Sequence, residues 1–90
     1  MYESQIQRWS EIPIVSALSM QVLEVQQGVA EILVPRPKEM DGVFECFHGG
    51  LLMTVADTLA CLAIMSHTGP DQKMTTTDMN IRFLAPCYSS

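Results

Sequence analysis

Four polar side chains interrupt the most apolar stretch of this sequence at the spacing of a single helix face. They stand at positions i, i+3, i+4 and i+7 and are Thr54, Asp57, Thr58 and Cys61. Burying an unpaired carboxylate is costly, so Asp57 needs a hydrogen-bond partner, water or a cleft beside it. In a cleft it could act as a general base; the alternative is a structural carboxylate that caps or hydrogen-bonds a neighbouring backbone group.

The segment His48-Gly49-Gly50 stands where this helix is expected to begin. Glycines let a ligand approach the backbone, and the free N–H groups of a first helical turn form a positive site. Such a site can polarise a carbonyl group, as an oxyanion hole does. A Gly-Gly pair alone is most often only a turn, so this pair gains meaning from the acid that follows it.

The distance between these two features decides what they can do together. Gly49 and Asp57 are eight residues apart, which corresponds to about 12 Å along a helix. One carbonyl group therefore cannot be held by the Gly49 amide and attacked through Asp57 of the same chain. Two such helices, packed antiparallel across a two-fold axis, would bring Gly49 of one subunit beside Asp57 of the other. A catalytic site at these residues therefore requires a dimer.

The elements that must position these residues follow the order helix, strand, strand, long helix, strand. They are a short helix over 2–9, a β-hairpin over 19–34 that turns at Gln27-Gly28, a long helix over 48–65 and a strand over 74–85. Turn signals at Glu11-Ile12-Pro13 and at 67–71 end the two helices, and residues 36–47 form a connecting loop.

The long helix is apolar on nearly every side, and such a helix is normally buried. An antiparallel sheet wrapped around it is the economical solution for a chain of 90 residues. We therefore expect an α+β fold in a single domain over residues 1–90. A domain of this size leaves surplus apolar surface, which predicts a dimer or a larger assembly.

Charge and cysteine content limit the partners and the compartment. The net charge of −5 repels nucleic acid and anionic membranes, so neither is an expected partner. Cys46, Cys61 and Cys87 form no Cys-x-x-Cys pair and no cluster with metal-ligand spacing, which favours free thiols. The stretch Leu51–Met65 is expected to be too short and too polar to span a bilayer, and no secretory signal is seen. We expect a cytoplasmic protein.

Two runs of the sequence resemble PaaI-like hotdog-fold thioesterases. The first is residues 48–58, in which His48-Gly49-Gly50 is followed by Asp57 nine positions after the histidine. The second is residues 76–86, similar to the strand that follows the helix in that family. The resemblance spans nearly all of the chain and implies the hotdog fold, an antiparallel sheet wrapped around a long central helix.

The resemblance also implies a hydrolase that acts on acyl- or aryl-CoA thioesters, without a metal or other cofactor, as a homodimer or homotetramer. Asp57 matches the general base or nucleophile, and Gly49 matches the residue whose backbone N–H polarises the thioester carbonyl. His48 matches a residue that shapes the helix start, and Thr76 falls where some relatives place a serine that positions water. Further candidates for substrate contact are Gly50, Thr58 and Cys61, with core packing as the alternative for Cys61.

Two features depart from the family pattern. Many relatives carry an amide side chain six positions before the histidine, where this sequence has Gly42, with Asp41 and Glu45 nearby. Relatives also continue with further strands, so the domain is expected to lack its last strands and to leave a strand edge open. Both departures favour an alternative function, a non-catalytic hotdog remnant that binds an acyl group or acts as an interaction module. A hotdog dehydratase fits less well, since its Asp and His are spaced differently.

A CoA phosphate group would need a basic patch near the site. The candidates are Arg36, Lys38, Lys73 and Arg82. Solvated surface is the expected role of all four, and His67 is expected at the surface or at the end of the helix.

Overall fold

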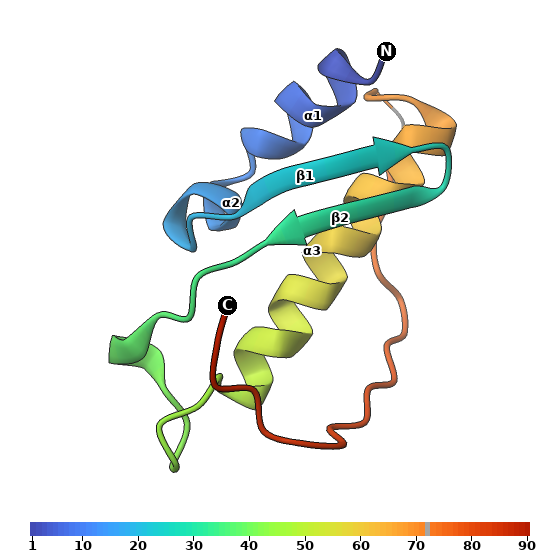
Figure 1. Cartoon of the computed structure of the whole chain (residues 1–90). Helices are drawn as coiled ribbons and strands as arrows, with labels where there is room; N and C mark the ends of the chain where they lie inside the picture. The colour runs from blue at the N-terminus through green and yellow to red at the C-terminus, as the bar shows by residue number, and fades with distance from the viewer. Residues whose placement is uncertain (72) are drawn as a thin grey trace.

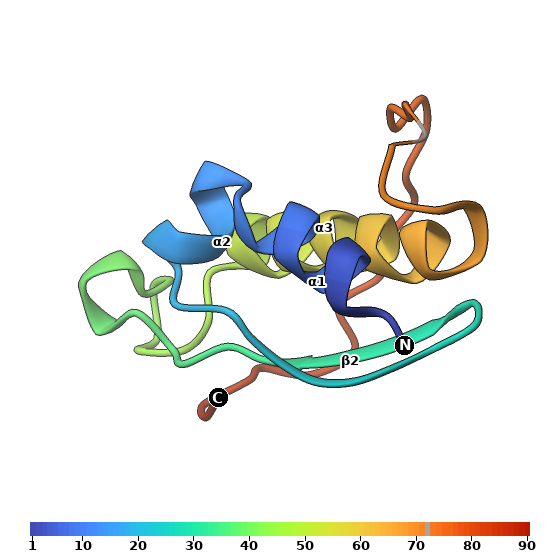
Figure 2. The same cartoon turned by 90° about the horizontal axis from the view of Figure 1, so that it is seen from above.

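The computed structural model describes residues 1–71 and 73–90 of the chain. Its elements are α1 (Glu3–Ser10), α2 (Pro13–Ala17), β1 (Gln21–Gln26), β2 (Val29–Leu33), the short 3-10 helix η1 (Lys38–Met40) and α3 (Gly49–Thr68). The hairpin of β1 and β2 crosses one side of α3, and α1 lies alongside that helix (Figure 1; Figure 2). The residues after α3 run back in an extended path toward its N-terminal end (Figure 1).

The predicted hairpin forms, and a β-bulge adjusts which of its side chains face the helix. The register shifts between Val22 and Glu24, so Leu23 is the extra residue. Because of the bulge, Val22 and Val25 both pack toward α3 although they are three residues apart. Leu23 points away from the core and is 52% exposed. On the same outer face Glu24 stands opposite Glu31 of β2.

The turn of the hairpin is fastened to the C-terminal end of α3. Gly28 has a φ of 77°, which suits glycine in a tight hairpin turn. Its N–H donates to Oγ of the buried Ser66 at 2.8 Å, and that hydroxyl donates to the Ala63 carbonyl at 2.6 Å. The Gln27 amide lies 3.1 Å from the ring of His67, which is exposed in the last helical turn as predicted.

The main core joins α1, α3 and the hairpin, and Trp9 lies at its centre. Trp9 is fully buried and packs with Val15, Leu62 and Met65. A buried indole N–H needs an acceptor. Trp9 Nε1 donates to the backbone carbonyl of Thr58 at 2.8 Å. The hydrogen bond ties α1 to the middle of α3, one residue from Asp57.

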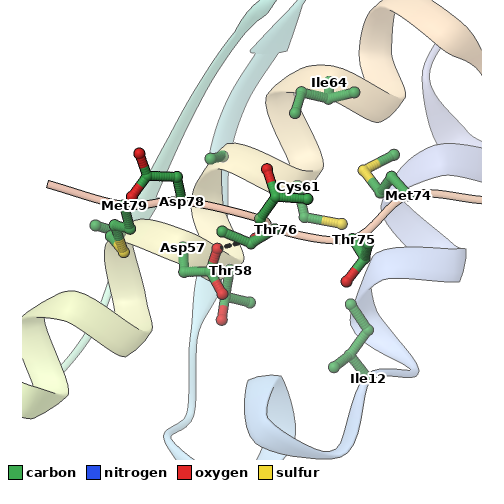
Figure 3. Close-up of a pocket in the computed structure, with 13 residues that line it drawn as sticks. Ile12, Asp57, Thr58, Cys61, Ile64, Met74, Thr75, Thr76, Asp78 and Met79 are labelled. Atoms are coloured by element: carbon green, nitrogen blue, oxygen red, sulfur yellow. Dashed lines mark hydrogen bonds between the residues drawn. The ribbon is translucent and has the colours of Figure 1, made fainter.

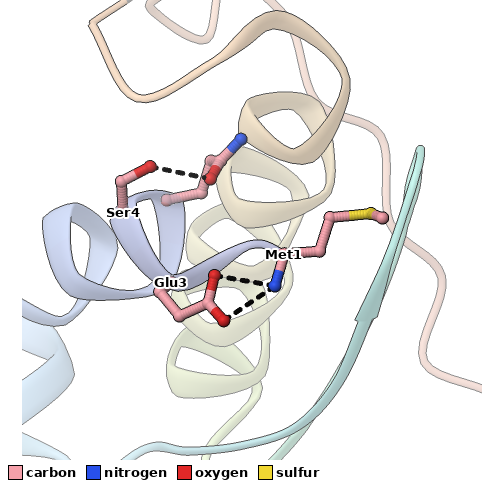
Figure 4. Close-up of polar contacts among 4 residues, drawn as sticks. Met1, Glu3 and Ser4 are labelled. Atoms are coloured by element: carbon pink, nitrogen blue, oxygen red, sulfur yellow. Dashed lines mark hydrogen bonds and ion pairs between the residues drawn. The ribbon is translucent and has the colours of Figure 1, made fainter.

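The start of α1 is held by charge at the surface (Figure 4). The N-terminal amine of Met1 lies 2.7 Å from each carboxylate oxygen of Glu3. Its hydrogen bond is the main reason that the pKa of Glu3 lies below the usual value, with a backbone hydrogen bond and the positive charge adding to the effect. Beside it, the Ser4 hydroxyl donates to the side chain of Gln5 at 3.0 Å. Such exposed pairs contribute little to stability.

The turn predicted at Glu11-Ile12-Pro13 forms, and it leads directly into α2, which was not predicted. Pro13 is the first residue of that helix. Proline is favoured there because its fixed φ suits a helix and the missing N–H would have no helical partner. The turn signal predicts only a turn at Pro13, so it misses the helix that begins at this residue.

The strand predicted over 74–85 is wrong for this chain alone: the described residues 73–90 include no strand. A strand needs a neighbouring backbone with which to exchange hydrogen bonds, and β1 and β2 pair only with each other. The segment keeps an extended path, and it is tied down near its end where Phe47 N–H donates to the Cys87 carbonyl at 2.8 Å.

The α+β class and the long helix are confirmed, but the sheet covers only one side of α3. The buried residues of this helix are Leu62, Met65 and Ser66, and most of the others are half-buried. The helix has 20 residues, ends at Thr68 and is capped by Gly69 with φ 107°. The prediction that its apolar stretch over 51–65 is too short and too polar for a bilayer is therefore wrong. By length and composition it could cross a membrane, a test that the central helix of a soluble protein also passes.

Replacing Ser66 by alanine is expected to loosen the hairpin from α3. The change leaves the Gly28 N–H without its acceptor, which should lower the free energy of unfolding by about 1–3 kcal/mol in urea titrations followed by circular dichroism. Thr68→Ala is the matched control, because its exposed hydroxyl bonds only the Ile64 carbonyl within α3. Equal losses in the two variants would contradict the proposed role of Ser66.

Candidate functional site

Asp57 meets the extended segment that follows α3. Thr76 Oγ1 donates to Asp57 Oδ1 at 2.5 Å, joining two residues that are 19 positions apart (Figure 3). Asp57 is half-buried on the helix and Thr76 is exposed. The contact brings together the predicted acid and the predicted water-positioning residue. It also means that the Thr76 hydroxyl is directed at the carboxylate and orients it.

The pair opens into a hollow of about 550 Å³ between α3 and the extended segment. This volume lies in the range of small-molecule sites, which is ~300–1,000 Å³. One wall comes from α3 and the opposite wall from residues 74–79, with Ile12 contributed by the turn before α2 (Figure 3). Asp57 is therefore placed at a surface hollow, as an acid on an apolar helix requires.

The other hydroxyls of the polar stripe are occupied within the helix. Thr54 Oγ1 donates to the Gly50 carbonyl at 3.0 Å, and Thr58 Oγ1 donates to the Thr54 carbonyl at 2.7 Å. Both are ordinary back-bonds to the preceding turn. Thr58 nevertheless lines the hollow beside Asp57, whereas Thr54 lines a separate hollow near His48.

Cys61 lies one helical turn beyond Asp57, and the core packing given as its alternative role is confirmed, while substrate contact stays a prediction. It lines the hollow and also packs against the core cluster around Trp9. Its Sγ lies 3.9 Å from the sulfur of Met65. Burial raises the pKa of the Cys61 thiol, and the negative charge of Asp57 raises it further. A thiol held in its protonated form is a poor nucleophile, so Cys61 acts as a wall of the hollow.

The start of α3 leaves one backbone N–H available. His48 is the N-cap, and its Nδ1 accepts from the Gly50 N–H at 2.9 Å. In the described part of the chain the Gly49 N–H has no such acceptor. A side chain at Gly49 would meet the Phe83 ring at 3.3 Å, so the ring lies close against this glycine. His48 shapes the helix start as predicted, and the Gly50 N–H is occupied by its hydrogen bond to the His48 side chain.

Within one chain, the helix start and the acid line different hollows. Gly49 faces one lined also by Phe47, Leu52 and Phe83, and Asp57 faces the hollow with Thr76. This arrangement agrees with the separation of about 12 Å along the helix. The chain therefore brings Asp57 and Thr76 together and keeps Gly49 apart from them.

Arg36 is the basic residue whose surroundings differ most from those expected. Its side chain is 16% exposed, and its Nε lies 3.2 Å from Asp41 Oδ1 as an ion pair without hydrogen-bond alignment. Its guanidinium also donates to the Tyr88 carbonyl at 2.6 Å. The expectation of solvated surface is wrong for Arg36, and its charge is neutralised rather than offered to a phosphate. Asp41 lines the hollow near His48, but it is engaged by this ion pair.

Several residues near the site were not named from the sequence, and Ile12 and Phe83 come from the least expected places. Ile12 reaches the hollow from the turn between α1 and α2, and Phe83 packs against Gly49. Neither has a chemical group that would draw attention, and both arrive through tertiary packing. Among the described residues, no group of three or more His, Cys, Asp or Glu side chains lies close enough to hold a metal ion.

Comparison with known proteins adds one finding. Residues 44–90, more than half of the chain, match the family model of the thioesterase superfamily. No curated protein and no solved structure matches the chain. The matched region contains His48, Gly49, Asp57 and Thr76, and it implies the hotdog fold and the hydrolysis of a thioester. The chain belongs to the thioesterase superfamily.

Proposed function

We propose that this chain is a subunit of a PaaI-like thioesterase that hydrolyses an acyl- or aryl-CoA thioester at a site on a homodimer interface. The observation that carries the proposal is the hydrogen bond between Thr76 Oγ1 and Asp57 Oδ1. It places an oriented carboxylate at the edge of a hollow large enough for a small molecule. Family membership supports the reaction class, and the geometry supports Asp57 and Thr76 as the proposed residues.

Asp57 is the proposed general base. With Oδ1 occupied by Thr76, Oδ2 takes a proton from a water molecule whose oxygen attacks the thioester carbon. The carbon–sulfur bond then breaks, and the thiolate that leaves takes up the proton that the carboxylate received. The products are a carboxylic acid and a free thiol. Direct attack by the carboxylate, followed by hydrolysis of the anhydride formed, is the second route open to the same residue.

Gly49 is the proposed polariser of the thioester carbonyl. Its N–H has no acceptor in the described chain, and it lies at the positive end of a 20-residue helix. Such a donor stabilises the negative charge that develops on the carbonyl oxygen during attack. Since Gly49 and Asp57 of one chain are too far apart, the donor comes from the partner subunit's Gly49.

Self-association is also supported by what α3 leaves uncovered. The hairpin and α1 pack against α3, yet only Leu62, Met65 and Ser66 of this largely apolar helix are buried. A second copy would cover more of this surface and bring the two halves of each site together. A homodimer is the minimum assembly, and a homotetramer would join two such dimers through a second interface.

A non-catalytic module that binds an acyl group is the alternative. Two observations favour it: the sheet has two strands, and Gly42 stands where many relatives carry an amide. Gly42 is held in the loop by its N–H, which donates to the Cys46 carbonyl at 2.8 Å. A protein that binds acyl-CoA without releasing thiol, unchanged by Asp57→Ala, would support this alternative.

Asp57→Asn is expected to remove activity while keeping the contact with Thr76, because the amide oxygen can still accept that hydrogen bond. Hydrolysis of a panel of acyl-CoAs, followed by thiol release, should fall by about a hundredfold or more. Asp78→Asn is the matched control, since Asp78 lines the same hollow and is exposed. An Asp57→Asn enzyme as active as Asp78→Asn would contradict the role of Asp57 as base or nucleophile.

Gly49→Pro is expected to delete the proposed carbonyl donor without breaking α3. Proline is favoured at the first helical residue, and His48, with φ −64° and ψ 132°, already has the backbone that precedes a proline. The value of kcat should fall by about a hundredfold, as for loss of one oxyanion donor. Gly49→Ala keeps the N–H while adding a Cβ against Phe83, so equal losses in both variants would point to crowding instead.

Mixing the two inactive variants tests the shared site directly. A heterodimer of Asp57→Asn and Gly49→Pro subunits contains one site in which both groups are intact. After unfolding and refolding an equal mixture, roughly a quarter of the wild-type rate should return if subunits pair at random. Each variant refolded alone is the control. If the refolded mixture has the native mass of a dimer but regains no activity, a site shared between subunits is contradicted.

A further inference from the structure

We infer that the hollow beside Asp57 takes an uncharged aliphatic acyl chain of medium length, and that Ile12, Ile64 and Met74 set that length. The inference rests on the proposed function, because it assigns the substrate class of the same site. It depends on the direction in which the hollow extends from Asp57 and on the chemistry of its walls.

The hollow becomes apolar in one direction from the catalytic pair. Asp57, Cys61 and Ile64 lie at i, i+4 and i+7 on α3, so Ile64 is about 10 Å further along the helix axis. On the opposite wall Met74 precedes Thr76 by two residues, about 7 Å along an extended chain. Figure 3 shows Cys61, Ile64, Met74 and Ile12 gathered on the same side of the Asp57–Thr76 contact. An acyl chain whose carbonyl lies at Asp57 can therefore extend between the apolar side chains of α3 and a wall made of Met74 and Thr75.

Ile12 closes this end from a part of the chain that lies outside the family match. The matched residues are 44–90, so the wall at Ile12 is a feature of the N-terminal segment of this chain. Its position is firm, because Ile12 N–H donates to the carbonyl of the fully buried Trp9 at 3.1 Å. Trp9 is in turn bonded to Thr58, the neighbour of Asp57. The end wall and the carboxylate are thus fixed to the same turn of α3.

The charges around the hollow favour an uncharged chain. The charged residues that line it are Asp57 and Asp78, both acidic, and no Lys or Arg is among its described lining residues. A second carboxylate at the far end of an acyl group would leave water for this part of the hollow, where no Lys or Arg is among the described lining residues to pair with it. Methylene groups gain by leaving water for apolar walls, at about 0.8 kcal/mol for each one buried.

The length limit comes from the boundary with the next hollow. Ile12, Cys61 and Met74 line both the Asp57 hollow and an adjoining one that also contains the charged residues Arg8, Asp71 and Lys73. A chain that passes the three shared side chains leaves the Asp57 hollow and reaches charged groups. Chains that stop before this boundary gain the burial without that cost, so the optimum lies at medium length.

The test uses both turnover and binding. The value of kcat/KM is measured for butyryl-, octanoyl-, dodecanoyl- and succinyl-CoA, and Kd is measured by calorimetry for S-butyl-, S-octyl- and S-dodecyl-CoA. These thioethers cannot be hydrolysed, so they report on the hollow alone. The wild-type protein should prefer octanoyl over dodecanoyl, and butyryl over succinyl, by at least about tenfold.

Two variants change the hollow without emptying the core. Ile64→Phe is tolerable because Ile64 is 48% exposed, and it should lower the octanoyl-to-butyryl ratio by about tenfold. Met74→Ala shortens a side chain at the boundary between the two hollows and should raise the dodecanoyl-to-octanoyl ratio. Leu23→Phe, an exposed leucine on the far face of the hairpin, is the matched control and should change neither ratio.

The outcomes separate this inference from the proposed function. Hydrolysis with the same chain-length ratios in Ile64→Phe and the wild type would overturn the assignment of the hollow and leave the thioesterase intact. A preference for S-octyl-CoA that Ile64→Phe abolishes, with no thioester hydrolysed, would support the hollow and overturn the enzyme. Equal binding of all three thioethers by the wild-type protein would overturn the inference whether or not turnover occurs.

Discussion

A long apolar helix with one carboxylate in its middle constrains everything else in this molecule. The apolar sides of helix α3 must be shielded from water, whereas the Asp57 carboxylate must keep contact with water or a polar partner. The hairpin covers one side, α1 covers another through Trp9, and the extended segment passes over the carboxylate without forming a strand. The hollow at Asp57 is the space that remains between α3, the extended segment and Ile12. The packing of other segments around α3 therefore also creates the hollow at Asp57.

Trp9 shows how the constraint is met on the side of α1. Its ring fills the core, and its N–H reaches the Thr58 carbonyl, so a single side chain sets both the distance and the axial position of α1 on α3. Ile12 is carried into place by the same anchor. The N-terminal helices, which lie outside the family match, thereby become part of the site rather than an addition to it.

The sequence predicted the elements with strong local signals and missed those that depend on contacts. The apolar helix, the hairpin turn at Gly28 and the importance of Asp57 each follow from periodicity or residue type. The bulge at Leu23 does not, because only the pairing of two strands shows where a register shifts. The strand over 74–85 has the right alternation, but alternation supplies no hydrogen-bond partner. Thr76 was found through resemblance, and its contact with Asp57 required the chain to return along α3.

The two acids that face each other across the hairpin have a consequence for assembly. Glu24 and Glu31 are direct partners in the register and stand on the surface that points away from α3. Like charges directly opposite each other weaken the pair and repel any second layer brought against them. The two carboxylates therefore oppose the docking of a second layer on this face, at some cost to the hairpin itself. In the proposed dimer, contact through this face would bring Glu24 and Glu31 of both copies together.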